Sequence, residues 1–436
     1  MKNLVKIALL LMMMAASFLP LFCFGQERYE EMPYDTLWKM YEEERALNHY
    51  FYYERGRALN IRHAIKKKAT QEQNAFHYFK STAIGYRMKG EWGEDHLPSF
   101  ASDWDDPDSN LYIALGYYVE AQNFYHEKKA PHLLRQCFDR MPQNVPLEDG
   151  KWDFLRIIND LQPHPFTTLN DLLIAEGLSI VAGDTATVNY LIDKAISAHQ
   201  SPDDRQKVIE FEILRWQQLI SEITYPIDSS EYWQALNRIE ATYGSDEALD
   251  LARGLVLTLF NRSTNGATDY GTMALEYYNK ILNSSTTGYY REEAHRCRAE
   301  LLAKFMESAS PIGVVAPAHK LRLSVTCTNI DTLYVSVFPA RYRELITQSH
   351  RLYTSYREYW QPREEYLSTL LFTQRFVVDC HEPGRPITTE LWLDSLPLGE
   401  YDLYFHTQPE LNTAGALMES HLRVSRLLVS SWQAPV

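Results

Sequence analysis

The chain has 436 residues, of which 45% are hydrophobic, 23% are charged and 13% are aromatic. This composition is ordinary for a well-packed globular protein, and it excludes global disorder, a collagen-like fibre and a small disulfide scaffold. The 43 basic and 57 acidic side chains give a formal net charge of −14. That balance argues against nucleic acid as a partner, because phosphate recognition needs a basic surface. The length predicts two or three domains. The composition by itself does not indicate any particular reaction.

Residues 1–25 are typical of a secretory signal peptide. Lys2 and Lys6 accompany an apolar run over residues 7–24, which is short for a membrane span. The run ends in a small residue, so we expect cleavage between Gly25 and Gln26. Loss of the two lysines then moves the formal charge of the mature chain from −14 to −16.

Cys23 offers an alternative, in which the signal is that of a lipoprotein. The large residues 20–22 disfavour this interpretation, because lipoprotein processing needs small residues there. No second apolar run of spanning length follows, so we predict no integral membrane span. The sequence therefore predicts an exported protein, located in the periplasm, at the cell surface or outside the cell.

Four cysteines remain after cleavage, and export permits them to form disulfides. They are Cys137, Cys297, Cys327 and Cys380. Their spacing matches no zinc pattern. Cys327 and Cys380 end two strand-like runs and are the best candidates for a disulfide. An interpretation with equal support is that all four cysteines are small buried thiols.

From residue 35 to about residue 308 the hydrophobic pattern is helical almost throughout. Asp35, Asp184 and Asp246 are suited to cap helices, because a carboxylate accepts hydrogen bonds from free amides in the next turn. Further helices are expected at about 108–128, 152–159, 169–181, 185–198, 203–221, 230–242, 246–261, 270–282 and 289–308.

Short helices joined by short turns are typical of stacked helical hairpins, as in an α-solenoid of the tetratricopeptide (TPR) kind. The small residues Gly116, Gly177 and Gly254 would let paired helices approach closely. No strict period of about 34 residues is present. We therefore predict an irregular, TPR-like helical-repeat domain over residues 26–309.

Prolines and a glycine interrupt the helical pattern at residues 310–319, which we predict to be a linker. Alternating runs at 321–327 and 333–338 flank a turn at 329–331 and predict two paired or adjacent strands. Later strands are expected at 373–380, 388–393, 400–406 and 420–430. Residues 320–436 are thus predicted to form a β-sandwich, which makes the whole chain an α+β multidomain protein.

Three stretches carry a resemblance to a known family. They are a helix end with Glu293, Ala294 and residues 299–304, the strands at 321–327 and 329–338, and the strand and turn at 389–391 and 396–401. In this order they resemble the amino-terminal region of bacterial (Bacteroidetes-type) alpha-2-macroglobulin family proteins. The likeness is good over residues 240–436, whereas before residue 240 only the general helical character is similar. It implies that the β-sandwich is a macroglobulin-like (MG) domain.

The resemblance implies binding rather than turnover. Large members of that family are exported protease inhibitors that trap a protease after it cuts a bait segment, and many carry an internal thioester from a Cys-x-Glu-Gln motif. The nearest string here, Thr70–Gln73, lacks the cysteine, and the 436 residues hold no bait region. We expect a non-enzymatic binding segment, either a fragment of a longer protein or a docking module. Its implied partner is a protein, with a protease as the candidate, and the alternative is a periplasmic TPR-like scaffold.

No catalytic residue, cofactor site or metal site is predicted. The acidic cluster at 103–110 lacks the Gly and Glu that a calcium loop requires, so we expect Asp108 to cap the next helix. The histidines form no metalloprotease motif, and His77, His126 and His295 are expected on polar helix faces. The basic run Lys66–Lys68 is expected on a solvated helix face.

Two aromatic stretches admit two interpretations. Residues 49–53 and the pair Tyr117 and Tyr118 could stack on sugar rings, but aromatic residues at such spacing more often fill the seams between helices. We expect these aromatic residues to fill the seams between helices.

Overall fold

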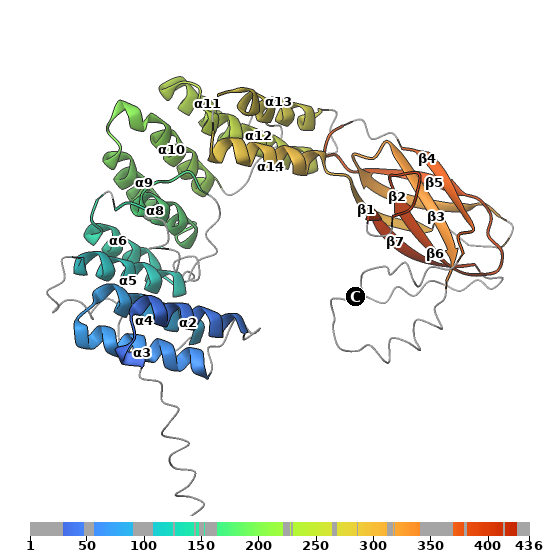
Figure 1. Cartoon of the computed structure of the whole chain (residues 1–436). Coiled ribbons are helices and arrows are strands. Elements are labelled where there is room, and N and C mark those ends of the chain that lie inside the picture. The colour runs from blue at the N-terminus through green and yellow to red at the C-terminus, as the bar shows by residue number, and fades with distance from the viewer. Residues whose placement is uncertain are drawn as a thin grey trace, which may run out of the picture. The chain divides into compact units, whose positions relative to one another are not determined.

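The structure is a computed structural model, and Figure 1 shows helices in its amino-terminal part and antiparallel sheets in its carboxy-terminal part, an α+β arrangement. It describes residues 29–47, 56–89, 108–124, 127–143, 145–147, 152, 164–220, 227, 230–263, 268–285, 287–311, 317, 319–340, 369–378, 382–412 and 415–424. Residue contacts divide the chain into two compact units. The helical unit comprises residues 1–225 and 229–243, and the mixed unit comprises residues 226–228 and 244–436.

In the helical unit, each α-helix contacts the next one along the chain (Figure 1). After the short 3-10 helix η1 (Tyr29–Glu31), the α-helices are α2 (Tyr34–Leu47), α3 (Arg57–Glu72), α4 (Ala75–Lys89), α5 (Ser109–Asn123), α6 (Ala130–Arg140), α8 (Leu169–Ile180), α9 (Thr185–Ala198), α10 (Arg205–Leu219, preceded by the 3-10 turn η3, Pro202–Asp204) and α11 (Glu231–Tyr243). The predicted ranges 108–128, 169–181, 185–198, 203–221 and 230–242 correspond to α5, α8, α9, α10 and α11 within about five residues, whereas no separate range is predicted for α3, α4 or α6. The helix predicted at 152–159 lies outside the described residues, apart from Trp152.

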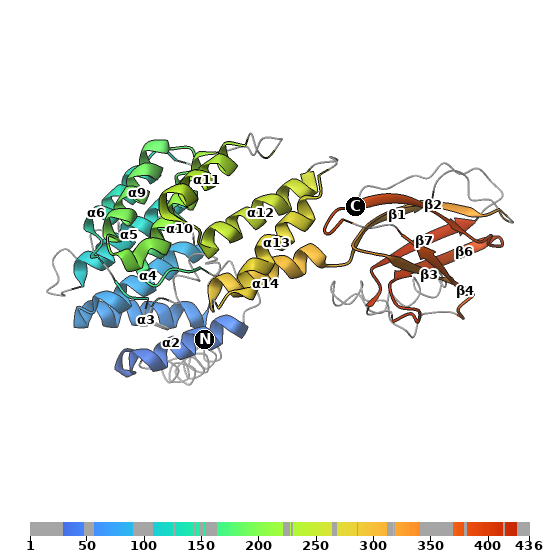
Figure 2. The same cartoon turned by 90° about the horizontal axis from the view of Figure 1, so that it is seen from above.

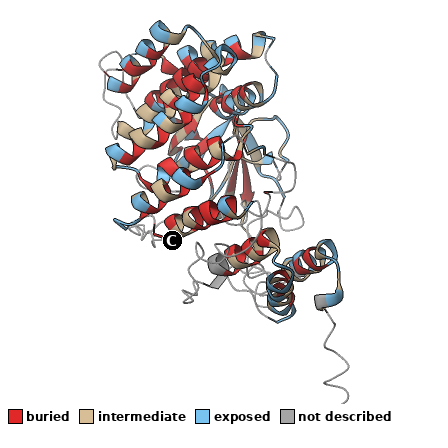
Figure 3. Cartoon of the chain, turned by 90° about the vertical axis from the view of Figure 1, so that its left-hand side faces the viewer, coloured by how far each residue is buried: buried red, intermediate tan, exposed pale blue. Residues whose placement is uncertain are grey.

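Local capping explains where some of these helices begin. The carboxylate of Asp184 accepts a hydrogen bond from the amide of Thr187 at 3.2 Å, which confirms the cap predicted for α9. Asp108 stands at the cap position of α5 but makes no side-chain capping bond. Between the helices, Leu37, Ile61, Phe79, Leu115 and Leu191 form part of one hydrophobic core. In Figure 3 the buried positions lie along the helix sides that face neighbouring helices.

In its described residues, the mixed unit combines helices α12 to α14 with two antiparallel sheets (Figure 2). Its elements are α12 (Glu247–Ser263), α13 (Tyr270–Asn283), α14 (Tyr289–Leu302), β1 (Phe305–Pro311), β2 (Leu321–Thr328), β3 (Thr332–Pro339), β4 (Phe372–Val377), β5 (Ile387–Leu393), β6 (Gly399–His406) and β7 (Met418–Val424). The strand order is β1-β2-β5 in one sheet and β4-β3-β6-β7 in the other. Alternate residues of both sheets, among them Val325, Val335 and Phe405, bury their side chains in one shared core.

Two predictions about these strands are wrong. The helix expected to run to Ser308 ends at Leu302, and the chain becomes strand β1 from Phe305 onwards because this segment pairs with β2. The runs 321–327 and 333–338 are strands, but they belong to different sheets and do not pair with each other. Ile330, between them, is fully buried, so the turn inserts into the core instead of closing a hairpin.

Two asparagines join the helices of the mixed unit to its sheets. The side-chain amide of Asn329 donates to the carbonyl oxygens of Leu301 and Ala303 at 2.8 Å, and its oxygen accepts from the amide of Gly384 at 2.8 Å. Asn261, on α12, donates from its side-chain amide to the carbonyl of Pro383 at 2.8 Å. The chain before β5 is thereby held against the ends of α12 and α14.

Candidate functional site

The structure describes one of the residues predicted to form a site. Cys327 lies on β2 and is fully buried between the two sheets. Cys380, its predicted disulfide partner, lies outside the described residues, as do Cys23 and the predicted cleavage site at Gly25 and Gln26. The disulfide and the cleavage site therefore remain predictions.

Two other cysteines are buried thiols in the helices. Cys137 on α6 is fully buried, and burial raises the pKa of its thiol well above the usual range. Burial also raises the pKa of Cys297 on α14 to about 11, with the carboxylate of Glu293 adding to the effect. Because the thiolate is the nucleophilic form, neither residue is suited to nucleophilic chemistry at neutral pH.

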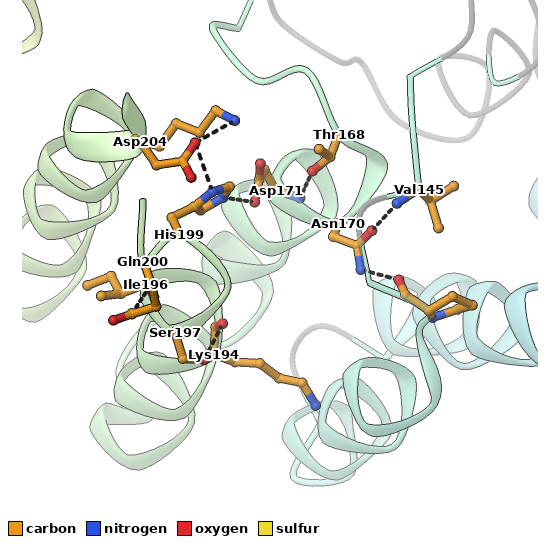
Figure 4. Close-up of polar contacts among 12 residues, drawn as sticks. Val145, Thr168, Asn170, Asp171, Lys194, Ile196, Ser197, His199, Gln200 and Asp204 are labelled. Atoms are coloured by element: carbon orange, nitrogen blue, oxygen red, sulfur yellow. Dashed lines mark hydrogen bonds and ion pairs between the residues drawn. The ribbon is translucent and has the colours of Figure 1, made fainter. Parts of the chain in front are cut away.

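A buried histidine links the ends of α8, α9 and α10 (Figure 4). Nε2 of His199, the residue that follows α9, donates to Oδ1 of Asp171 at 2.8 Å. Nδ1 of the same ring lies 3.7 Å from Oδ1 of Asp204, which precedes α10. The side chains of His199 and Asp171 are only 4% and 3% exposed. The ring also stacks on Phe211.

Asp171 sits in the first turn of α8, where the amide of Asp171 donates to the hydroxyl of Thr168 at 3.2 Å. The positive end of the helix favours its negative charge. Its second oxygen, Oδ2, is buried and accepts no hydrogen bond. In this His199 cluster the side chains of His199 and Asp171 are closed to solvent, while Asp204 is 27% exposed. The cluster contacts three helix ends, so its evident role is to hold these helices together.

Sequence reasoning missed the His199 cluster. Asp171 and His199 are 28 positions apart, and no local pattern predicts that they meet. A partial signal was present, since Thr168 followed three residues later by an acidic side chain is typical of a helix start.

A second buried histidine lies on the four-stranded sheet. Nε2 of His406 accepts from the hydroxyl of Ser336 at 2.8 Å, and its Nδ1 donates to the carbonyl of Gln408 at 2.7 Å. The Ser336 hydroxyl lies 2.7 Å from that of Thr373. Burial lowers the pKa of His406, which favours the neutral ring that this tautomer requires.

A serine paired with a neutral histidine has the geometry of a nucleophile and its base. Ser336 is fully buried, however, and His406 is only 2% exposed. The pair connects β3 with β6, and Thr373 extends the connection to β4. It is therefore arranged to satisfy buried polar atoms across three strands.

The N-terminal helices bring His77 into an aromatic cluster. Its ring stacks on Tyr34 with centroids 3.7 Å apart, and Nδ1 accepts from the indole nitrogen of Trp38 at 3.1 Å. Burial lowers the pKa of His77 to about 4, and the positive charge of Lys80 adds to this effect. His77 is thus half-buried and neutral at pH 7, rather than simply a polar residue on a helix face.

The other sequence-predicted residues have varied surroundings. Lys68 departs from the solvated face expected for it, because its side chain is 12% exposed and donates to the carbonyl of Met32 at 2.8 Å. Tyr118 is fully buried, and the ring of the half-buried Tyr117 lies 5.8 Å from the guanidinium carbon of Arg140, as expected for a seam between helices. His295 is exposed, whereas His126 and residues 49–53 lie outside the described residues.

A row of polar side chains crosses α6, α9 and α10, and we call it the polar ladder. From α6, Arg135 donates to the hydroxyl of Thr187 at 2.9 and 3.1 Å. Asp139 accepts from the hydroxyl of Tyr190, which lowers the pKa of this carboxyl, and from Lys194 at 3.1 Å.

The ladder continues from α9 to α10. Arg215 donates to Asn189 at 2.9 Å and to Asp193 at 2.7 Å. The side chains of Asp139 and Asp193 are 64% and 70% exposed. The ladder therefore carries charges of both signs across three helices. Its acidic side chains face solvent, while Thr187 and Arg215 lie beneath them, and it is the candidate binding surface of the helical unit.

Among the described residues, no group of three or more His, Cys, Asp or Glu side chains is arranged to hold a metal ion. None of the described helices is long and apolar enough to cross a membrane. The chain matches no protein-family model, and a comparison with curated proteins finds no match.

Proposed function

We propose that this chain is an exported, non-enzymatic binding protein related to the amino-terminal region of alpha-2-macroglobulin-type protease inhibitors. In this proposal the helices form an irregular TPR-like solenoid, and the two sheets form an MG-like β-sandwich. Its partner is a protein, with a protease as the first candidate. Covalent trapping is not part of the proposal, because the sequence has no Cys-x-Glu-Gln motif.

One observation carries this proposal: one unit consists of helices packed in chain order, and in the other unit helices are followed directly by two antiparallel sheets with a shared core. Such helical arrays offer extended surfaces built from successive helices, which suits protein partners. The polar ladder is a surface of this kind. The buried nucleophiles support a non-enzymatic role, since Ser336 and Cys137 are closed to solvent.

A defined protease panel tests the proposal. The full chain, immobilised through its carboxyl terminus, is presented with catalytically blocked serine, cysteine and metalloproteases at concentrations on the order of micromolar. We expect at least one protease to be retained reversibly. If none is retained, the inhibitor relationship is a matter of ancestry alone and the protease assignment fails.

The alternative function is an independent TPR-like scaffold for a partner other than a protease. It is favoured by the division of the chain, because helices α2–α11 form a compact unit with a core of their own. The variant Asp193→Lys reverses an exposed charge of the polar ladder, and Glu300→Lys reverses an exposed charge on α14 as a matched control. Loss of partner retention in Asp193→Lys alone would place binding on the helical unit.

A further inference from the structure

The outer surface of β2 and β5 carries one exposed aromatic ring among hydroxyl and charged side chains. These strands pair without interruption, and their register places Arg322 opposite Trp392, Ser324 opposite Glu390 and Thr326 opposite Thr388. Along β5, Thr388, Glu390 and Trp392 are all exposed, while their neighbours in the strand are buried or half-buried. We call this surface the Trp392 face.

Trp392 has one contact to its ring and one to its backbone. The guanidinium carbon of Arg322 lies 5.8 Å from the ring centroid. Arg322 is itself held by Glu390, with Nε 2.7 Å from the carboxylate oxygen. On the backbone side, the carbonyl of Trp392 accepts from the side-chain amide of Gln374 at 3.1 Å. Trp392 is 51% exposed, so a large aromatic surface beside Arg322 is accessible to solvent.

The charges on this face cancel. Arg322 forms an ion pair with Glu390, and at the end of the same strands Lys320 lies 3.8 Å from Asp394. The remainder is hydroxyl-bearing, and the hydroxyls of Thr326 and Thr388 lie 2.9 Å apart. The face is therefore polar without net charge, unlike the chain as a whole with its formal charge of −14.

We propose that the Trp392 face binds an uncharged glycan chain. A sugar ring offers a C–H face that stacks on an indole and a rim of hydroxyl groups that donate and accept hydrogen bonds. Trp392 supplies the stacking surface, while Arg322 and Glu390 beside it supply donors and acceptors of fixed direction. The absence of net charge on this face complements an uncharged polyhydroxyl ligand and gives no attraction for an anionic one. This proposal does not rest on the proposed protein-binding function.

Affinity electrophoresis of the full chain provides the test. The gels contain hydroxyethyl cellulose or neutral arabinoxylan as uncharged probes, and carboxymethyl cellulose as an anionic probe with the same backbone as the first. We expect retardation by an uncharged probe. Because an aromatic contact of this kind is worth about 0.5–1.5 kcal/mol, Trp392→Ala should weaken binding roughly two- to tenfold, whereas Trp392→Phe should retain most of it.

Val377→Ala is the matched control, since Val377 is an apolar residue on an edge strand of the other sheet and is 75% exposed. It should leave retardation unchanged. The far-ultraviolet circular dichroism of each variant verifies that it is folded.

Three outcomes would overturn the proposal. The first is that the wild-type chain migrates identically with and without each uncharged polysaccharide. The second is that Trp392→Ala and the wild type are retarded equally. Loss of protease retention in Trp392→Ala without any polysaccharide effect would identify a protein-docking surface and would likewise reject the glycan.

Discussion

Removing the His199 side chain should destabilise the helical unit far more than removing a surface ion pair. In His199→Leu, a side chain of similar size occupies the site, but Asp171 loses its donor at 2.8 Å and keeps a second oxygen that has no partner. Leaving a buried charge uncompensated in this way costs about 3–5 kcal/mol. The cost corresponds to an increase of roughly two to four orders of magnitude in the local opening equilibrium.

Hydrogen exchange read by mass spectrometry is the appropriate assay, because a chain with two compact units has no single free energy of unfolding. Peptides from α8 and α9 should exchange faster in His199→Leu, while peptides from β2 and β3 serve as the internal reference. Lys194→Leu, which removes a half-exposed ion pair of the polar ladder, should cost less than about 1 kcal/mol.

The double variant Asp171→Leu with His199→Leu separates a buried charge from simple loss of packing. Replacing both members of a buried pair by apolar side chains is often neutral or stabilising, so the double variant should be more stable than His199→Leu alone. If it is less stable, or if His199→Leu costs no more than Lys194→Leu, the charge argument is refuted. The cluster would then stabilise the helices through contacts such as the stacking on Phe211.

Three further predictions concern glycine, histidine and asparagine positions. Gly254→Ala should destabilise the mixed unit, because the new methyl group would lie 2.5 Å from the Tyr278 ring. Gly177→Ala meets only ordinary contacts at 3.6 Å and should stabilise its helix by up to about 1 kcal/mol, and thermal melts of the two variants test this contrast. The folded state lowers the pKa of His77 from the usual 6.5 to about 4, so the contribution of His77 to stability is complete above pH 6.5 and is lost as the pH falls towards 4. The melting temperatures of the wild type and His77→Gln, measured across that range, should therefore converge at low pH. Asn329 has a φ of 57°, in the left-handed region that glycine adopts more readily than alanine. Asn329→Ala should therefore be less stable than Asn329→Gly by about 1 kcal/mol, although both variants lose the side-chain hydrogen bonds. Equal denaturation midpoints of the two variants would contradict this.

The helices could be predicted from sequence because their signals are local. Apolar spacing and caps such as Asp184 lie within one turn of the residues they affect, so α8 to α14 begin close to where the pattern places them. The same reasoning treats Gly177 and Gly254 as equivalent small residues. Only the structure distinguishes them, because the difference lies in a side chain from another helix, Tyr278.

The strand pairing and the polar clusters could not be predicted in this way, because they depend on partners distant in sequence. Phe305–Pro311 has little apolar alternation and is a strand only because β2 supplies hydrogen-bond partners. Asp171 and His199, and likewise Ser336 and His406, meet through packing that no local pattern encodes. From the sequence, Trp392 is an ordinary strand residue. Only the structure shows that its ring is exposed and lies beside Arg322.

The two asparagine contacts give the mixed unit a physical basis for including its helices. A linker at 310–319 would leave the sheets free to turn about the last helix, yet β1 begins at Phe305, only a few residues after α14. Asn329 fixes the end of α14 to the turn between β2 and β3, and Asn261 fixes α12 to the chain before β5. Both hydrogen-bond backbone carbonyls, which are present whatever the neighbouring side chains are. These two amide side chains therefore help to fix the orientation of the helices on the sheets, and a partner that contacts α12 or α14 meets a surface that is held to the sheets.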